Sequence, residues 1–265
     1  ANHLVSFEAG LRENMVPQDA TAVVESANLA ELVVDFESFL LEHQLGGQVQ
    51  LQGNQATFSL IGKAAHGSTP SKGVNAATFL AKYLPRFEFD QAGAESFLHL
   101  LADHLHLDFE GVNLGLAHRD PVMQELTMNV GLVNYQDDKG GSVVANFRYP
   151  KGTDPEKMAA QTAQRLAGHD LSVEWGEFKE PHYVSVDDPM VKELLAVYEE
   201  QTGLEGHEMT IGGGTYGRLM PRGVAYGALF PDSIDTMHQA NEFIAIDDLL
   251  KATAIYAEAI YRITR

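Results

Sequence analysis

The chain has 265 residues, of which 45% are hydrophobic, enough material for one large or two ordinary globular domains. Its formal net charge of −19, spread along the chain as on a solvated surface, argues against nucleic acid or an anionic membrane as a partner. Cysteine is absent, which excludes disulfides and thiolate chemistry and suits a cytoplasmic protein, and no apolar run approaches the roughly 20 residues of a membrane span.

The first part of the chain predicts a mixture of strands and helices. Because it opens directly on strand-like alternation, without an initiating Met, we expect a processed or truncated product. Asn28 followed by Glu31 is typical of a capping box, and we expect the helix it opens to end at Gly46-Gly47. The elements expected in order are strands at 1–10 and 21–25, a helix from 29, and strands at 48–51 and 56–61 joined by a hairpin turn.

Further along, a polar loop at 62–73 precedes more helices and two long strands. The expected elements are helices at 75–84 and 92–104, strands at 126–135 and 142–148, a helix from a capping box at 153–156 to residue 167, and a strand at 171–178. Helices interspersed with hairpins predict an α+β domain over residues 1–180. Its helices should pack on one face of a mainly antiparallel sheet.

A Pro- and Asp-containing stretch at 180–189 is typical of a linker between domains. A helix should follow from Pro189 to Thr202 and end at Gly203. Beyond it we expect a strand near 209, a helix near 216, a strand at 224–230 and a helix at 247–263.

This alternation predicts an α/β layer, but so few strands form only an incomplete α/β domain. Its last helix should bury a stripe of Leu249, Tyr256, Ile260 and Ile263. We therefore expect the chain to lack part of the sheet, and apolar surface to be exposed around residues Leu194, Leu229 and Ile255.

Several residues are candidates for chemistry, each with a structural alternative. Three successive glycines at 212–214 could form an anion nest or only a tight turn, and the motif is neither a Walker loop nor a dinucleotide fingerprint. His238, close to Asn241-Glu242, could be a metal ligand or general base, or a core histidine. His66 could be a polar loop residue or the hydrogen-bond donor to an oxyanion.

Other candidates have weaker patterns. Arg148, at the end of a strand, could be a surface charge or a carboxylate clamp, and Asn14 is by default a turn residue. The pairs His106/Asp108 and His118/Asp120 spell His-x-Asp motifs, and Glu199/Glu200 is a carboxylate pair. The first pair follows an expected helix and the last lies on one, and we expect none of the three to bind metal.

Four motifs in the same order, at 62–70, 146–154, 212–218 and 237–242, resemble those of the M20 metallopeptidases nearly end to end. The similarity is greatest to the bacterial Xaa-His, or carnosinase-like, dipeptidases of the PepV group. The resemblance implies an α/β catalytic domain with an inserted lid domain. It also implies two zinc ions, or manganese or cobalt, that activate a water to hydrolyse a dipeptide.

The resemblance assigns a role to each matching residue. His238 matches a zinc ligand, and His66 matches a lid histidine that stabilises the oxyanion. Asn14 and Arg148 match lid groups that bind the substrate carboxylate, and Gly214-Thr215 match part of the pocket wall.

The family's N-terminal segment, which carries the other metal ligands and the general base, has no counterpart in this sequence. We therefore expect residues 1–180 to be the lid, residues 181–265 the C-terminal part of the catalytic domain, and the chain alone to be inactive. One histidine does not satisfy tetrahedral zinc, so no intact metal site is expected, and self-association is plausible. The alternatives are a non-catalytic lid-type module for peptide binding or dimerisation, a phosphate-binding protein, and a metal site at the His-x-Asp motifs.

Overall fold

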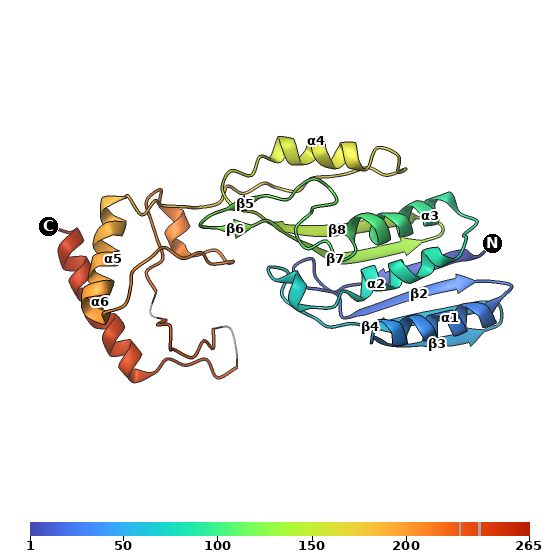
Figure 1. Cartoon of the computed structure of the whole chain (residues 1–265), viewed down its shortest axis with the longest axis horizontal. Coiled ribbons are helices and arrows are strands. Elements are labelled where there is room, and N and C mark those ends of the chain that lie inside the picture. The colour runs from blue at the N-terminus through green and yellow to red at the C-terminus, as the bar shows by residue number, and fades with distance from the viewer. Residues whose placement is uncertain (228, 238–239) are drawn as a thin grey trace. The chain divides into compact units, whose positions relative to one another are not determined.

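A computed structural model describes residues 1–227, 229–237 and 240–265 (Figure 1). The chain divides into two compact units, residues 1–179 and residues 180–265. Within the described ranges, no helix combines the length and the apolar character that crossing a membrane would require.

The first unit is built on a six-stranded antiparallel sheet with the order β3-β4-β2-β1-β7-β8. Its strands are β1 (His3–Ala9), β2 (Asp19–Glu25), β3 (Gly46–Gln52), β4 (Gln55–Ile61), β7 (Thr127–Gln136) and β8 (Gly140–Arg148), and a separate short pair comprises β5 (Arg119–Asp120) and β6 (Gln124–Glu125). The helices are α1 (Leu29–Glu42), α2 (Ala76–Tyr83), α3 (Ala92–His99) and α4 (Pro155–Arg165), with shorter helical turns at η1 (Pro70–Lys72), η2 (Leu84–Arg86) and η3 (Leu100–Leu105).

Helices α1 and α3 pack on the same face of this sheet. Phe7 of β1 and Phe58 of β4 both pair with the same β2 residue, so their side chains share a face, and Tyr135 of β7 lies opposite Phe7. The ring of Phe36 in α1 lies 5.1 Å from Phe58, and that of Phe97 in α3 lies 5.6 Å from Phe7. The expected α+β architecture, with helices on an antiparallel sheet, is therefore confirmed for this unit.

The expected start of the first helix after Asn28 is confirmed, but its capping box and its expected end are wrong. Asn28 precedes α1, but its side chain donates to Glu31 Oε2 at 2.5 Å and makes no hydrogen bond to the helix backbone, so the capping box does not form. Helix α1 ends at Glu42, and Gly46-Gly47 begin β3. A Cβ at Gly47 would lie 2.5 Å from the carbonyl oxygen of Ser59, so the glycine there serves strand pairing and not helix termination.

The last third of the first unit departs from expectation in two places. Asp154, and not Thr153, caps α4, because its carboxylate accepts from the backbone N–H groups of the second and third residues after it. The strand expected at 171–178 does not form. Trp175 instead packs on Phe147 and Phe178 stacks on the ring of Tyr149, so aromatic contacts take the place of sheet pairing.

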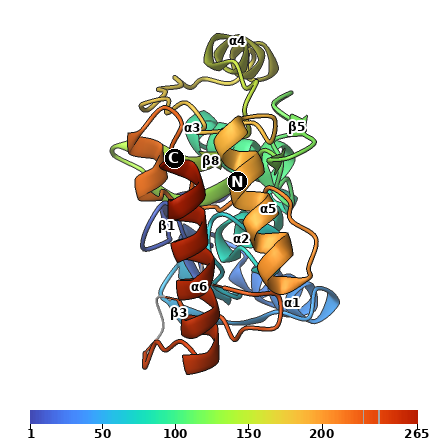
Figure 2. The same cartoon turned by 90° about the vertical axis from the view of Figure 1, so that its left-hand side faces the viewer.

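The second unit consists of two packed helices and irregular segments. Helices α5 (Pro189–Thr202) and α6 (Ile246–Ile263) lie side by side (Figure 2), and η4 (Tyr216–Leu219) is a short turn. The expected start of α5 at Pro189 and its end at Gly203, which adopts the left-handed conformation, are confirmed. A small core joins the two helices through Leu194, Val197, Phe230, Ile255 and Ala259.

The expected strands near 209 and at 224–230 are not present among the described residues of those stretches. The expected buried stripe of α6 is also wrong, because Leu249, Ile260 and Ile263 are exposed and Tyr256 is half-buried. The buried face instead carries Ala252, Ile255 and Ala259, and Ile255 and Ala259 belong to the core shared with α5.

The apolar surface expected around Leu194, Leu229 and Ile255 is confirmed only in part. Leu194 and Ile255 are buried in the contact between α5 and α6, whereas Leu229 is 56% exposed. The two helices thus cover each other at positions that we expected an additional sheet to cover.

Candidate functional site

Two loops of the first unit, around Asn14 and around His66, are hydrogen-bonded side by side. The Gly67 N–H donates to the carbonyl oxygen of Asn14 at 2.7 Å, and Val16 N–H donates to the carbonyl oxygen of Ala65 at 2.9 Å. Residues Met15 and His66 form an isolated antiparallel bridge between these bonds. Asn14 and His66, two residues expected in the site and 52 positions apart in the sequence, therefore lie on neighbouring segments.

Close approach of the backbones depends on glycines. A Cβ at Gly67 would lie 2.8 Å from the carbonyl oxygen of Asn14, and a Cβ at Gly131 of β7 would overlap the carbonyl oxygen of Glu13. The segment around Asn14 is thus held between the His66 loop and strand β7. Any side chain larger than hydrogen at Gly67 or Gly131 would push these backbones apart.

Beneath the Asn14 segment lies Asn129, a buried polar residue of β7. Its Nδ2 donates to the carbonyl oxygens of Glu13 and Met15, each at 2.9 Å, and the residue is 1% exposed. The backbone on both sides of Asn14 is therefore fixed by one side chain. Asn14 itself is exposed.

The imidazole of His66 is exposed, and its hydrogen bonds assign its tautomer. The Ser68 backbone N–H donates to His66 Nδ1 at 3.1 Å, and Ser68 Oγ lies 2.7 Å from the same nitrogen. Because a backbone N–H only donates, Nδ1 must be the acceptor, and the proton of the neutral ring lies on Nε2. That N–H is the group that could donate to a developing oxyanion.

Arg148 lies at the end of β8, near the same segment. It pairs with Thr127, and the next pair on that face joins Asn146 to Asn129, so Arg148 shares the face on which Asn129 holds the Asn14 segment. Two residues along a strand span about 7 Å, which a long arginine side chain can bridge. Asn14, His66 and Arg148 are thus brought to one end of the sheet, although their roles in a site stay predictions.

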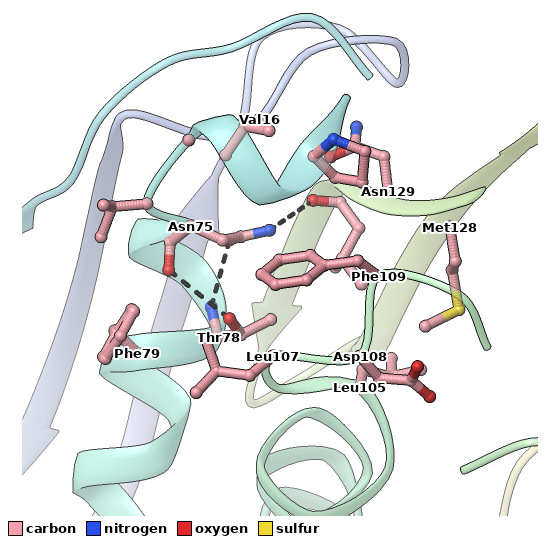
Figure 3. Close-up of a pocket in the computed structure, with 14 residues that line it drawn as sticks. Val16, Asn75, Thr78, Phe79, Leu105, Leu107, Asp108, Phe109, Met128 and Asn129 are labelled. Carbon is pink, nitrogen blue, oxygen red and sulfur yellow. Dashed lines mark hydrogen bonds between the residues drawn. The ribbon is translucent and has the colours of Figure 1, made fainter. Parts of the chain in front are cut away.

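A small cavity adjoins this end of the sheet on the helix side (Figure 3). It is lined by Val16, Pro70, Gly73, Val74, Asn75, Thr78, Phe79, Leu105, Leu107, Asp108, Phe109, Met128, Asn129 and Val130. Its volume of about 30 Å³ accommodates a water molecule but no dipeptide. Figure 3 shows how Asn75 caps α2, accepting from Thr78 N–H while its Nδ2 donates to the Val130 carbonyl oxygen. The cavity therefore adjoins the candidate site but is too small to bind the substrate.

The first His-x-Asp motif is engaged in structural contacts. His106 Nδ1 lies 3.1 Å from Thr78 Oγ1, and burial lowers the pKa of His106 to about 4, with smaller contributions from Lys82 and His43. The Asp108 carboxylate accepts from the backbone N–H groups of residues 110, 112 and 113 and closes the turn that follows η3.

The second His-x-Asp motif and the Glu pair also have structural partners. The Asp120 carboxylate lies 2.8 Å from Lys151 Nζ, and that contact, with two backbone N–H donors, lowers the pKa of Asp120 to about 2. His118 Nε2 lies 3.1 Å from the Lys151 carbonyl oxygen. Glu199 accepts from Gly206 N–H, and Glu200 pairs with Arg262 of α6.

In the second unit, the glycine turn and the expected metal ligand are only partly described. Gly214 is exposed and Thr215 half-buried, and a Cβ at Gly214 would overlap the guanidinium of Arg218. The turn therefore accommodates an arginine of its own chain. His238 lies outside the described residues, and the neighbouring Asn241 and Glu242 are exposed. In the ranges that the structure describes, no three His, Asp or Glu side chains gather as a metal site would require.

Two residues of this arrangement, Asn129 and Ser68, were missed in the sequence. Asn129 stands between the apolar Met128 and Val130 and two residues before Gly131, and a polar residue and a glycine at such positions in a strand signal a bulge or a close backbone approach. The structure has that irregularity between Val130 and Leu132. Ser68 had no comparable signal, because serine is common in any polar loop.

Comparisons with known proteins show what the sequence is similar to. The sequence model of peptidase family M20/M25/M40 matches residues 16–262. Over 263 residues the chain is 45% identical to the Beta-Ala-Xaa dipeptidase of Lactobacillus delbrueckii subsp. lactis, covering 99% of this chain and 55% of that protein. It is 39% identical over 264 residues to "Putative dipeptidase YtjP" of Bacillus subtilis (strain 168), covering 99% of this chain and 56% of that protein. The chain thus spans about half the length of the curated relatives it matches.

Proposed function

The chain belongs to peptidase family M20/M25/M40, and from that premise we propose that the protein is a metal-dependent dipeptidase whose substrate-binding residues lie in these 265 residues. The similarity to a Beta-Ala-Xaa dipeptidase and to several dipeptidase-named relatives supports a dipeptide as substrate. A PepV-like preference for Xaa-His, or carnosine-like, dipeptides is the finer part of the proposal.

The observation that carries the proposal is the pairing of the Asn14 and His66 loops. Gly67 N–H bonds the Asn14 carbonyl oxygen at 2.7 Å, and register places Arg148 on the face that this segment covers. An amide donor, a guanidinium and an imidazole N–H at one end of a sheet suit an anionic peptide terminus and the oxygen of its scissile carbonyl.

Each residue has a distinct chemical role in this proposal. Arg148 and the Asn14 side chain bind the carboxylate of the dipeptide and thereby fix its length, because a longer peptide has no terminal carboxylate at that position. His66, with its proton on Nε2, donates to the carbonyl oxygen as negative charge develops there. Gly214-Thr215 form part of the pocket wall.

Members of the family bind divalent metals such as zinc, which activate water and polarise the scissile carbonyl. The described residues of this chain do not offer the donor set for such a centre. We propose that His238 is one ligand and that the other ligands and the general base come from sequence outside these 265 residues. Zinc is the proposed metal, with manganese or cobalt as alternatives.

The same proposal assigns a role to each of the two units. Residues 1–179 act as the lid and residues 180–265 as part of the catalytic domain. The polypeptide of residues 1–265 alone is inactive. Exposed apolar residues of the second unit, such as Leu229, Ile234 and Phe243, give it a tendency to self-associate. The protein is cytoplasmic in this proposal.

The test compares the full-length enzyme with the polypeptide of residues 1–265. The full-length enzyme should hydrolyse β-alanyl and α-linked dipeptides, not tripeptides, and should lose activity to a chelator and regain it with zinc. Elemental analysis after dialysis should find less than one metal per 1–265 polypeptide and no turnover.

Two results would contradict the proposal. Two tightly bound metals per 1–265 polypeptide, with turnover, would mean that the ligands lie among these residues. Dipeptide binding by that polypeptide without metal, combined with an inactive full-length protein, would instead support a non-catalytic peptide-binding module.

A further inference from the structure

We propose that Asn129 is a positioning residue of the substrate site, which presents Asn14 to the substrate carboxylate through the backbone on both sides of it. This inference rests on the proposed function. Asn129 is not in contact with the substrate in the proposal, since it is 1% exposed and lies beneath the segment that it holds.

The geometry identifies the atoms through which Asn129 holds the Asn14 segment. Nδ2 of Asn129 lies 2.9 Å from the carbonyl oxygen of Glu13 and 2.9 Å from that of Met15. Both partners are acceptors only, so the amide must direct its nitrogen, with both hydrogens, toward them. One planar group thereby sets the distance between the two carbonyls that flank Asn14.

Among the described residues, the segment has one further carbonyl contact, which holds a different residue from those that Asn129 holds. Gly67 N–H binds the carbonyl oxygen of Asn14 itself, from the opposite side. Three consecutive carbonyl oxygens, at residues 13, 14 and 15, are therefore each bonded to a defined donor, and Asn14 is exposed. The segment needs such ties because it lies in a turn whose strand-type pairing is the single bridge between Met15 and His66.

The two hydrogen bonds of the Asn129 side chain are both made by its Nδ2 donor, and its acceptor oxygen makes none among the described residues. Oδ1 of Asn129 is buried and has no hydrogen-bond partner in the part of the chain that the structure describes. An apolar residue of similar size would avoid that unpaired oxygen, but it would leave the carbonyls of Glu13 and Met15 without donors.

The predicted consequence is a loss of substrate affinity, because Asn14 would no longer be fixed in its binding position. In the full-length enzyme, Asn14→Ala should raise KM for a dipeptide roughly 10- to 100-fold, with kcat little changed. Asn129→Ala should raise KM roughly tenfold. The double variant should be no worse than Asn14→Ala, because the two act through the same contact.

The preference of the enzyme for a free dipeptide over the corresponding dipeptide amide is a readout that a merely structural role of Asn129 would not change. The amide lacks the carboxylate, so the preference of the enzyme for the free dipeptide over its amide should fall in Asn129→Ala as it does in Asn14→Ala. The matched control is Tyr83→Phe, which also removes a buried donor to a backbone carbonyl, that of Leu32, in the helical layer. It should lower the melting temperature and leave this preference unchanged.

The outcomes separate the inference from the proposed function. If Asn14→Ala raises KM but folded Asn129→Ala does not, the positioning role is wrong and the proposed function stands. If the wild-type enzyme hydrolyses no dipeptide, both are wrong. Should Asn129→Ala fail to fold, Asn129→Ser, which retains one donor, decides the question: an intermediate KM supports the role, and a wild-type KM overturns it.

Discussion

His106 Nδ1 lies 3.1 Å from the hydroxyl of Thr78, which places an imidazole in a half-buried contact between the end of η3 and helix α2. Burial disfavours its charged form, and the positive charge of Lys82 and the nearby His43 act in the same direction, so its pKa falls from 6.5 to about 4. The contact should therefore make folding sensitive to acid between about pH 6.5 and pH 4, a range that begins well above the ordinary pKa of a carboxylate.

The first prediction concerns this pH range. The folded pKa of His106 is lower than the unfolded one, so its stabilisation is complete above about pH 6.5 and is lost as pH falls toward 4. The wild-type free energy of unfolding should drop on the order of 1–3 kcal/mol more than that of His106→Gln between pH 7 and pH 4.5. Urea denaturation at both pH values measures the difference. Equal losses in the two proteins would show that His106 is not kept neutral by the fold.

A second prediction follows from the close approach of β7 to the Asn14 segment. In Gly131→Ala, the new Cβ would overlap the carbonyl oxygen of Glu13, so the segment must shift, and we expect a loss of about 1–3 kcal/mol. Gly93→Ala is the matched control, because nothing lies within 4 Å of its Cβ in helix α3. It should be neutral or stabilise by up to about 1 kcal/mol. Thermal denaturation of both variants tests this, and equal melting temperatures would contradict it.

The third prediction concerns Asp120 and Lys151, 2.8 Å apart. The lysine first, and then the backbone N–H of Met123, lower the pKa of Asp120 to about 2. Because the folded pKa is depressed, the stabilisation is present above about pH 4 and is lost as pH falls toward 2. The melting temperature of the wild-type protein should therefore fall more steeply than that of Asp120→Asn between pH 5 and pH 2.5. Parallel curves would show that the ion pair contributes nothing.

A feature of the fold could be predicted from the sequence where the contacts that determine it are local. The hairpin at Gly53-Asn54, the start of α5 at Pro189 and its end at Gly203 depend on backbone conformations that those residues favour, and each was predicted. The buried face of α6 was not, because it depends on α5. Ala252, Ile255 and Ala259 are buried on that face, whereas Leu249 and Ile260 are exposed.

The candidate site shows the same division. Asn14, His66 and Arg148 could be proposed from motif resemblance, but their proximity depends on long-range contacts. Asn129 holds carbonyls 114 and 116 positions away in sequence, and no local pattern specifies such partners. What the sequence did contain was a polar residue between two apolar ones and two positions before a glycine, which indicates a special contact without identifying it.

The fourth prediction tests the chemistry proposed for His66. Ser68 N–H donates to Nδ1, so the ring proton lies on Nε2, where it can stabilise charge that appears only in the transition state. In the full-length enzyme, His66→Ala should therefore lower kcat about 100- to 1,000-fold with a small change in KM. Ser68→Ala keeps the backbone donor and removes only the hydroxyl contact, so it should cost less than about tenfold in kcat. Arg148→Ala is the contrasting variant and should mainly raise KM, because carboxylate binding contributes to ground state and transition state alike. Steady-state kinetics of the three variants distinguish these roles. A His66→Ala enzyme with normal kcat and raised KM would mean that the imidazole binds substrate and does not stabilise the oxyanion.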